Sequence, residues 1–148
     1  CDSDVLVPPD ILKKLIKHNK YCCSSLIYNG YIVSPQKPYL FPNILKFDGK
    51  GYYHINNWYV KQSPHLKEST LIQVDATGAV VLMSKEIFNN KNIRYGFHYQ
   101  GEDIYWSERV RSEGYNIYCD LGCFSKHIMT REMLNNYLKG EIYFENGS

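Results

Sequence analysis

Two acidic pairs and one late histidine are the groups in this sequence whose spacing suits chemistry. Asp2 and Asp4 open the chain one residue apart, and His127 stands towards its other end. Alternate residues on an extended segment point the same way, so both carboxylates can reach one hard cation. Two carboxylates with one neutral imidazole suit Mn²⁺ or Mg²⁺, and the imidazole favours manganese. The same Asp-x-Asp spacing is also common in ordinary solvated turns.

The second acidic pair, Glu102 and Asp103, follows Gly101. The pattern predicts a helix that begins at Gly101 and ends at Gly114, and the helix macrodipole favours negative charge in its first turn. Adjacent helical residues lie about 100° apart around the axis. Only one of the two carboxylates is therefore expected to face a reacting hydroxyl, where a carboxylate can act as a general base.

Other elements must hold these groups in place. Apolar spacing predicts a helix that starts at Pro9 and ends near residues 18–20, with an apolar face made of Ile11, Leu12, Leu15 and Ile16. Strands are predicted at 21–28, 71–74, 80–83 and 115–119, with a turn at Asn29-Gly30. The run at 80–83 is apolar enough for a buried strand away from the sheet edge. Ser84 and Thr130 are predicted to cap short helices that end at Phe88 and Leu138.

Two segments without regular structure are candidates for substrate contact. Residues 34–69 are aromatic and contain several prolines, with one weak strand expected from Tyr52 to Val60, and so long a segment in a compact domain is usually a functional loop. Trp58 is its best candidate for stacking on a substrate. The small residues from Asp75 to Ala79, with Thr77 and Gly78 among them, predict a turn that lets a ligand approach the backbone closely. A β-bulge would explain them equally well.

Composition limits the class of protein. The 148 residues are enough for one domain with a real core, and a hydrophobic content of 44% is ordinary for a globular protein. The net charge of +2, without a stripe of basic residues, does not favour a nucleic-acid partner. No apolar run approaches the roughly 20 residues of a membrane span. Five cysteines are an odd number without a secreted disulfide framework, so reduced thiols are expected.

Four motifs follow one another in a fixed order. They are Asp-Ser-Asp-Val-x-x-Pro-Pro-Asp, then Val-Asp-Ala-Thr-Gly-Ala-x-x-Leu-Met, then Gly-Glu-Asp-x-x-Trp with a following Gly-Tyr, and finally Lys-His-Ile. In this order they resemble the GT-A glycosyltransferases, and are similar to family 2 enzymes and to Anp1-like mannosyltransferases. The resemblance runs from Cys1 to about Met129. It implies an α/β domain over residues 1–148, the C-terminal part of a GT-A fold, with a mixed sheet flanked by helices.

The resemblance also implies roles for individual residues. Asp2 and Asp4 would be the metal-binding pair and His127 the late metal ligand, with Mn²⁺ or Mg²⁺ as the cofactor. Asp103 would be the catalytic base, with Glu102 as its neighbour or substitute. The implied substrate-binding residues are Asp75, Thr77, Gly78, Trp58 and Trp106.

The implied activity is metal-dependent transfer of a sugar from a nucleotide-sugar donor to a hydroxyl group of a carbohydrate, lipid-linked or protein acceptor, with inversion. The expected location is the cytoplasm or the cytoplasmic face of a membrane. In such enzymes the half that recognises the nucleotide precedes the Asp-x-Asp pair, and here nothing precedes it. We therefore expect these 148 residues alone to be inactive and the intact protein to be active.

A structural zinc module is a second class. Cys119, Cys123 and His127 stand four residues apart, and Cys22 or Cys23 would complete a tetrahedral site. Against this class, structural zinc sites usually contain a close Cys-x-x-Cys pair.

A carbohydrate-binding domain without catalysis is a third class. It would use Trp58, Trp106 and the 14 tyrosines, and it leaves both acidic pairs unexplained. Trp106 lies three residues after Asp103 and four before Val110, which favours packing beneath the helix rather than exposure.

Overall fold

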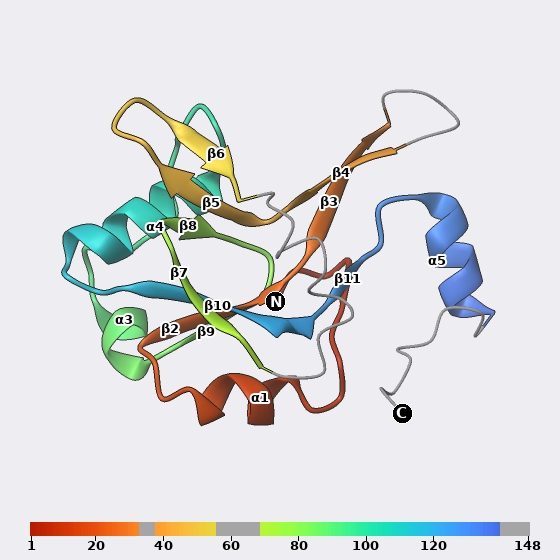
Figure 1. Ribbon diagram of the computed structural model, residues 1–148, viewed down its shortest axis with the longest axis horizontal. Helices are drawn as coiled ribbons and strands as arrows, with labels where there is room; N and C mark the ends of the chain where they lie inside the picture. The colour runs from red at the N-terminus through yellow and green to blue at the C-terminus, as the bar shows by residue number, and fades with distance from the viewer. Residues whose placement is uncertain (33–37, 56–68, 140–148) are drawn as a thin grey trace.

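A four-stranded mixed sheet forms the centre of the protein, whose computed structural model describes residues 1–32, 38–55 and 69–139 (Figure 1). Its strands lie in the order β7–β10–β2–β9. β2 and β10 run parallel to each other, while β7 and β9 are antiparallel to their neighbours. The bounds are β2 Cys22–Leu26, β7 Leu71–Val74, β9 Val81–Met83 and β10 Ile117–Phe124. The expected α/β class with a mixed sheet is confirmed.

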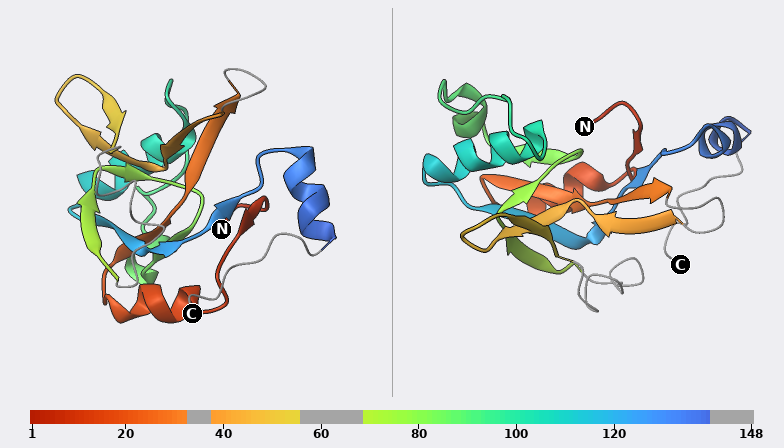
Figure 2. Two further views of the ribbon diagram at one scale, coloured as in Figure 1. Left: turned by 45° about the vertical axis from the view of Figure 1, so that its right-hand side comes forward. Right: turned by 90° about the horizontal axis from the view of Figure 1, so that it is seen from above.

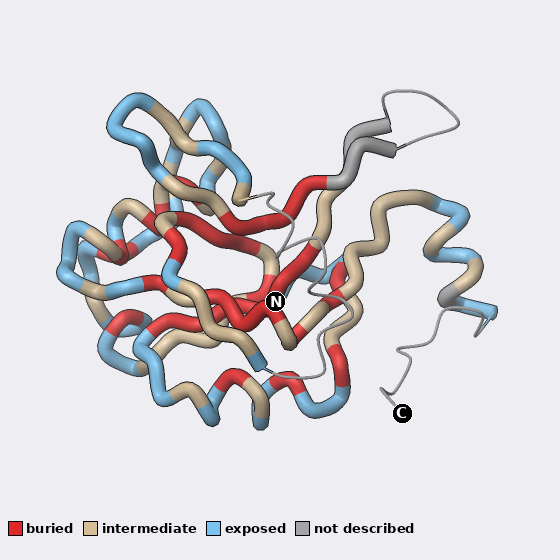
Figure 3. Tube along the Cα trace, viewed as in Figure 1, coloured by how far each residue is buried: buried red, intermediate tan, exposed pale blue. Residues whose placement is uncertain are grey.

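Helices cover both faces of this sheet. They are α1 (Ile11–Lys17) on one face and α3 (Lys85–Asn89) with α4 (Glu102–Ser112) on the other, while α5 (Arg131–Leu138) lies apart from the sheet (Figure 2). Because strand side chains alternate between faces, adjacent β2 residues enter different layers. Cys22 packs in one cluster with Trp106 of α4, whereas Cys23 packs in the other with Leu15 of α1. Figure 3 shows buried residues concentrated along the central strands.

Three small sheets extend the fold around the central one. They are β1 (Val5–Leu6) with β11 (Lys126–His127), β3 (Tyr28–Ile32) with β4 (Pro38–Pro42), and β5 (Ile44–Phe47) between β6 (Tyr52–His54) and β8 (Ala76–Thr77). All these pairings are antiparallel. The β1–β11 pair places Val5 opposite His127 and so joins the chain's opening to its last strand.

Helix boundaries follow the predicted signals closely. Ser84 accepts a hydrogen bond from the backbone N–H of Ile87 and caps α3, and Thr130 accepts one from Met133 and caps α5. Gly101 precedes α4, and Gly114 adopts a φ of +86° just after it, as a glycine stop requires. α5 stands to one side of the sheet (Figure 2). Within the described ranges, the longest helix has 11 residues, too few to cross a bilayer.

Residues 34–69 are predicted to be largely irregular, and this prediction is wrong for residues 38–55, a part that the structure describes. Residues 38–55 contain β4, β5 and β6, of which only β6 falls within the weak strand expected at 52–60, whose residues 56–60 lie outside the described part. Pro38 and Pro42 lie at the two ends of β4, which pairs only with β3, and an edge strand tolerates proline. The predicted Asn29-Gly30 turn is also wrong, because both residues lie in β3 and pair with β4.

The predicted strands are correct in place but not in detail. The strand expected at 115–119 runs from Ile117 to Phe124. β9 is an edge strand rather than an interior one. Its apolar character comes from coverage of both faces, since Leu82 packs on the α1 side and Val81 on the α4 side.

The predicted apolar face of α1 is half correct. Ile11 and Leu15 are buried, whereas Leu12 and Ile16 are 61% and 62% exposed. The seven-residue helix therefore docks on the sheet by one narrow stripe and leaves two apolar side chains on its outer side.

Candidate functional site

Asp4 and His127 lie together beside the β1–β11 pair. Nε2 of His127 is 3.1 Å from Oδ2 of Asp4, and the backbone N–H of Ile128 donates to the Asp4 carbonyl over 2.8 Å. The register that places Val5 opposite His127 brings the two side chains to the same end of the sheet. The chain's opening and its late histidine therefore meet as expected, although 123 positions separate them.

The ring of His127 is oriented by Asn29 of β3. Nδ1 of the ring is 2.8 Å from the amide oxygen of Asn29, which can only accept, so Nδ1 carries the proton. The lone pair of Nε2 then faces the negatively charged carboxylate of Asp4. This contact is favourable only when Nε2 carries a second proton or binds a metal ion. A neutral imidazole oriented through its other nitrogen is the usual arrangement of a metal-ligating histidine.

Asp2 points to a different neighbour than expected. Its backbone N–H donates to the carbonyl of Ala79 over 2.9 Å, and residues 2–5 turn rather than extend. In the described residues, no three His, Cys, Asp or Glu side chains are grouped as a metal site would need. The expected three-residue ligand set is thus reduced to Asp4 with His127. The alternation argument fails because it assumed an extended segment.

The carboxyl group of Asp103 rests against Gly78. A Cβ atom at position 78 would collide with that carboxyl group, so glycine allows the close approach. Burial raises the pKa of Asp103 to about 6, and the negative charges of Glu102 and Asp2 add to the rise. The carboxyl group therefore changes charge near neutral pH, which suits a general base.

Gly78→Ala is expected to reduce activity far more than stability. The atom in the way is the end of a movable side chain, so we expect the free energy of unfolding to change by less than about 1 kcal/mol as the carboxyl group moves aside. A displacement of about 1 Å at a reacting group can cost roughly 10²-fold in rate. Urea denaturation and a transfer assay measure the two effects. A fully active Gly78→Ala variant would show that the contact has no functional role.

A buried polar network holds β8 beneath α4. Asn43 donates to the Gly78 carbonyl over 2.8 Å and accepts from the backbone N–H of Ile27 over 2.9 Å. The backbone N–H of Thr77 donates to the Ser107 hydroxyl oxygen on α4, and the Thr77 hydroxyl donates to that of Ser24 on β2. Because these groups satisfy one another inside the protein, they fix the backbone that supports Asp103.

Thr77 and Ser107 exchange two hydrogen bonds: the backbone N–H of Thr77 donates to Oγ of Ser107 over 3.3 Å, and the Ser107 hydroxyl donates to the Thr77 carbonyl over 3.4 Å. This reciprocal pair ties strand to helix at one point. The substrate contact expected for Thr77 is therefore replaced by an internal role, since its side chain is buried.

Tyr95 borders the Asp103 carboxyl group from the loop before α4. Its ring stacks on Trp106 with a centroid distance of 5.9 Å and an interplanar angle of 17°. Burial raises the pKa of Tyr95 to about 12, and the nearby charges of Asp103 and Asp2 contribute to the rise. The Tyr95 phenol therefore lies near the carboxylates of Asp103 and Asp2. The sequence analysis did not identify this residue.

The remaining predicted substrate residues lie elsewhere. Asp75 accepts from the backbone N–H of Phe47 over 2.9 Å and pairs with Lys46 at 3.6 Å, so it stabilises the β5–β8 contact. Trp106 is only 3% exposed and belongs to the core, as its spacing favoured, which leaves no surface for a substrate to stack on. Trp58 lies outside the described residues.

A second polar cluster, absent from the sequence-based prediction, surrounds Asp120 of β10. Its Oδ2 lies 2.8 Å from Nε2 of His18 and accepts from the Ser69 hydroxyl over 2.7 Å, while Oδ1 accepts from the Gly122 N–H over 2.9 Å. The residue types are those of a Ser-His-Asp triad, but a triad uses both ring nitrogens. Here Ser69 and Asp120 share Nε2, so the cluster is structural.

The zinc interpretation is not supported by the cysteine environments. All five cysteines are free, and burial raises the pKa of Cys22, Cys23 and Cys123 to about 12. Burial raises the pKa of Cys119 as well. In the described residues no three His, Cys, Asp or Glu side chains are grouped as a zinc site would need, and Cys22 and Cys23 lie in different clusters.

Comparison of the chain with protein-family models and with curated proteins gave no match. The assignment of function therefore rests on the residues and their geometry.

Proposed function

We propose that the protein is a metal-dependent glycosyltransferase with the C-terminal part of a GT-A fold. The observation that carries the proposal is the position of the opening segment. Asp2 is hydrogen-bonded beside Gly78, which supports the Asp103 carboxyl group, and Asp4 lies against His127 only two residues later. One short turn thus links a candidate base to a candidate metal-binding pair, which is the arrangement that sugar transfer from a diphosphate requires.

Asp103 would accept the proton of the acceptor hydroxyl. As that oxygen attacks the anomeric carbon, the bond from this carbon to the diphosphate oxygen breaks, and the proton passes to the Asp103 carboxylate. A direct displacement of this kind inverts the anomeric carbon. The raised pKa of about 6 suits the step, because the carboxyl group is ionised at neutral pH yet more basic than an ordinary aspartate.

The residues present fit a divalent cation. Asp4 and His127 would hold it, and Asn29 orients the His127 ring through Nδ1 so that Nε2 faces Asp4. Mn²⁺ and Mg²⁺ sites in phosphate-handling enzymes often use one or two protein ligands and complete the shell with substrate phosphates and water, so two ligands suffice. When bound, the cation would neutralise the departing diphosphate.

Transfer is tested by incubating the intact protein with nucleoside diphosphate sugars and Mn²⁺ and measuring release of the nucleoside diphosphate. A panel of uridine- and guanosine-diphosphate sugars with simple glycoside acceptors covers the donor class. The proposal expects release that requires both the metal and the Asp103 carboxylate. Release that is unchanged in Asp103→Ala, or a complete lack of nucleotide-sugar and Mn²⁺ binding by the intact protein, would contradict it.

Substitution of the metal-binding pair is expected to weaken Mn²⁺ binding. Asp4→Ala and His127→Ala should each lower the affinity at least tenfold, and Asn29→Ala about tenfold, because the loss of a group that orients a ligand typically costs 10- to 100-fold. Electron paramagnetic resonance of free Mn²⁺ measures the affinity. Glu132→Gln, which removes an exposed acid from α5, is the matched control and should leave binding unchanged.

A further inference from the structure

The outer face of α1 concentrates positive charge beside exposed apolar side chains. Of the chain's 17 lysines and arginines, four lie in residues 11–20, a segment that contains no acid. The other 13 basic residues are outnumbered by the 15 acidic ones. Although the net charge of the whole chain is only +2, residues 11–20 carry a local excess of positive charge. The sequence-based expectation that basic residues form no stripe did not take this segment into account.

Four side chains make up this outer α1 face: Leu12, Ile16, Lys13 and Lys17. Leu12 and Ile16 are one helical turn apart, about 40° from each other around the axis, and both are more than 60% exposed. Lys13 and Lys17 form the next row and are exposed as well. Among the described residues neither lysine forms an ion pair, whereas Lys14 pairs with Asp10 at 3.2 Å.

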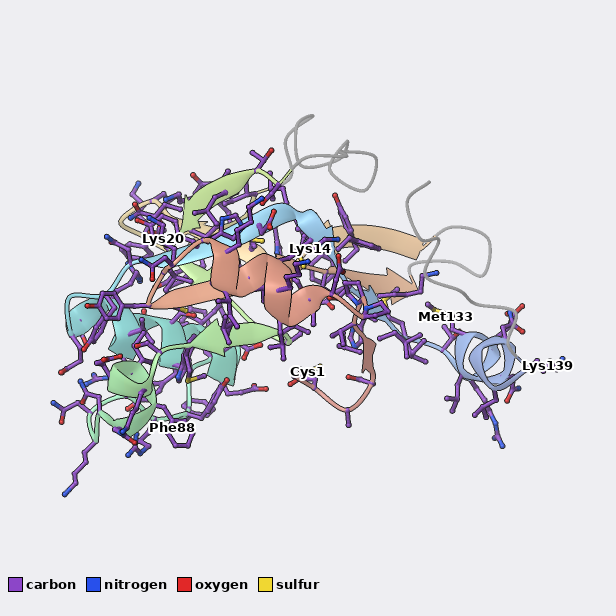
Figure 4. All side chains as sticks on the ribbon, turned by 90° about the horizontal axis from the view of Figure 1, so that it is seen from below. Cys1, Lys14, Lys20, Phe88, Met133 and Lys139 are labelled. Atoms are coloured by element: carbon purple, nitrogen blue, oxygen red, sulfur yellow. The ribbon has the colours of Figure 1, made fainter. Side chains whose placement is uncertain are left out.

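The face continues past the end of the helix. Lys20 places its ammonium group 4.7 Å from the centroid of the Tyr118 ring, and Tyr21 is exposed beside it. Figure 4 shows α1 on the near side of the sheet, with Lys14 on the helix, Lys20 past its C-terminal end, and Phe88 of α3 on a separate part of the surface.

We infer that the outer α1 face binds the surface of an anionic lipid membrane. Leucine and isoleucine would enter the acyl boundary while the lysines lie at the level of acidic headgroups, the usual division of roles in interfacial binding. The charge complementarity favours this occupant over a second copy of the chain, whose identical lysines would repel those of the first. Exposed apolar side chains would gain nothing from a nucleic-acid backbone, which favours lipid over that polyanion as well.

The expected strength follows from known contributions. Each lysine near an anionic surface contributes about fivefold to the binding constant. Lys13, Lys17 and Lys20 together predict roughly a 100-fold preference for anionic over zwitterionic vesicles. Because salt screens such attraction, binding should weaken on going from about 0.1 M to 1 M salt. The inference does not depend on sugar transfer.

Vesicle co-sedimentation tests it, with phosphatidylcholine vesicles alone or with one third phosphatidylserine. The double variant Lys13→Gln/Lys17→Gln should bind the anionic vesicles about 25-fold more weakly. Leu12→Ser/Ile16→Ser should reduce binding by roughly tenfold. The control Lys85→Gln/Lys91→Gln removes the same charge from exposed positions on and after α3 and should change binding less than twofold.

All substituted side chains are exposed, so thermal unfolding should confirm that the variants fold. Equal binding to both vesicle types would overturn the inference, as would an equal loss in the Lys85/Lys91 control. A dimer in light scattering that dissociates in Leu12→Ser/Ile16→Ser would assign the face to a second copy instead. RNA binding that is lost in the lysine variant, without vesicle binding, would likewise overturn it.

Discussion

Asp103→Asn is expected to lower sugar transfer by roughly 10²- to 10⁴-fold, because the amide cannot accept the proton of the acceptor hydroxyl. The substitution keeps the shape of the side chain against Gly78, so the loss would report the missing base rather than a collapsed site. With the unsubstituted protein, the rate should rise as the pH rises through about 6, where the carboxyl group becomes ionised.

The same substitution is expected to stabilise the fold above pH 6. Burial raises the pKa of Asp103 to about 6 in the folded protein, so the folded state holds this proton more tightly than the unfolded chain. The free energy of unfolding therefore decreases as the pH rises from about 4 to 6. The Asp103→Asn variant has no ionisable group at this position, so its stability does not decrease in this range. With allowance for partial exposure to water, we expect a gain of about 2 kcal/mol at pH 8 and little difference at pH 4.

Urea denaturation at several pH values measures this gain, and a transfer assay measures the loss of rate. Glu102→Gln is the control, because it removes a neighbouring charge and keeps the candidate base. It should shift the pH–rate midpoint to lower pH and retain most of the activity. A variant Asp103→Asn that transfers sugar normally would exclude the carboxylate as base, whatever its effect on stability.

Local signals explain which parts of the fold the sequence predicted. Ser84, Thr130 and Gly114 act on the backbone within a few residues of themselves, so their caps and stops are visible in the sequence. The Asn29-Gly30 signal failed because pairing with β4 overrode a local preference. The predicted burial of Leu12 and Ile16 is wrong for a similar reason. Periodicity identifies apolar positions but does not show how wide a stripe of the helix the sheet will cover.

The candidate site was predicted through the order of its motifs, and its supporting residues were not. Asn29 orients His127 across 98 positions, and Asn43 supports Gly78 across 35. Nothing in the spacing of such pairs predicts contact, because the β3–β11 contact and the β5–β8 pairing that create them join segments far apart in the sequence. Asp2 illustrates the opposite case. The sequence identified it as a candidate site residue, but a turn at residues 2–5 places it near Asp103 instead of His127.

Asp120→Ala is expected to cost the largest amount of stability of any substitution considered, about 3 kcal/mol. Asp120 is fully buried, and its carboxylate binds His18, Ser69 and the backbone of Gly122. Alanine would remove the shared acceptor of these donors, two of which, on His18 and Gly122, are partly buried, and each unsatisfied group costs free energy. The carboxylate joins α1, the start of β7 and β10, so its loss would loosen three segments at once.

The size of the effect separates this role from a catalytic one. Thermal unfolding should shift down by about 6–12 °C, at roughly 2–4 °C per kcal/mol for a chain of this size. The double variant His18→Ala/Asp120→Ala should be less destabilised than the sum of the single variants, because the two side chains lose the same contact. Mn²⁺ affinity at Asp4 and His127 should stay unchanged in the folded variant. A loss below about 1 kcal/mol would mean that water replaces the carboxylate, and selective loss of sugar transfer in a stable Asp120→Ala variant would place the cluster in the chemistry instead.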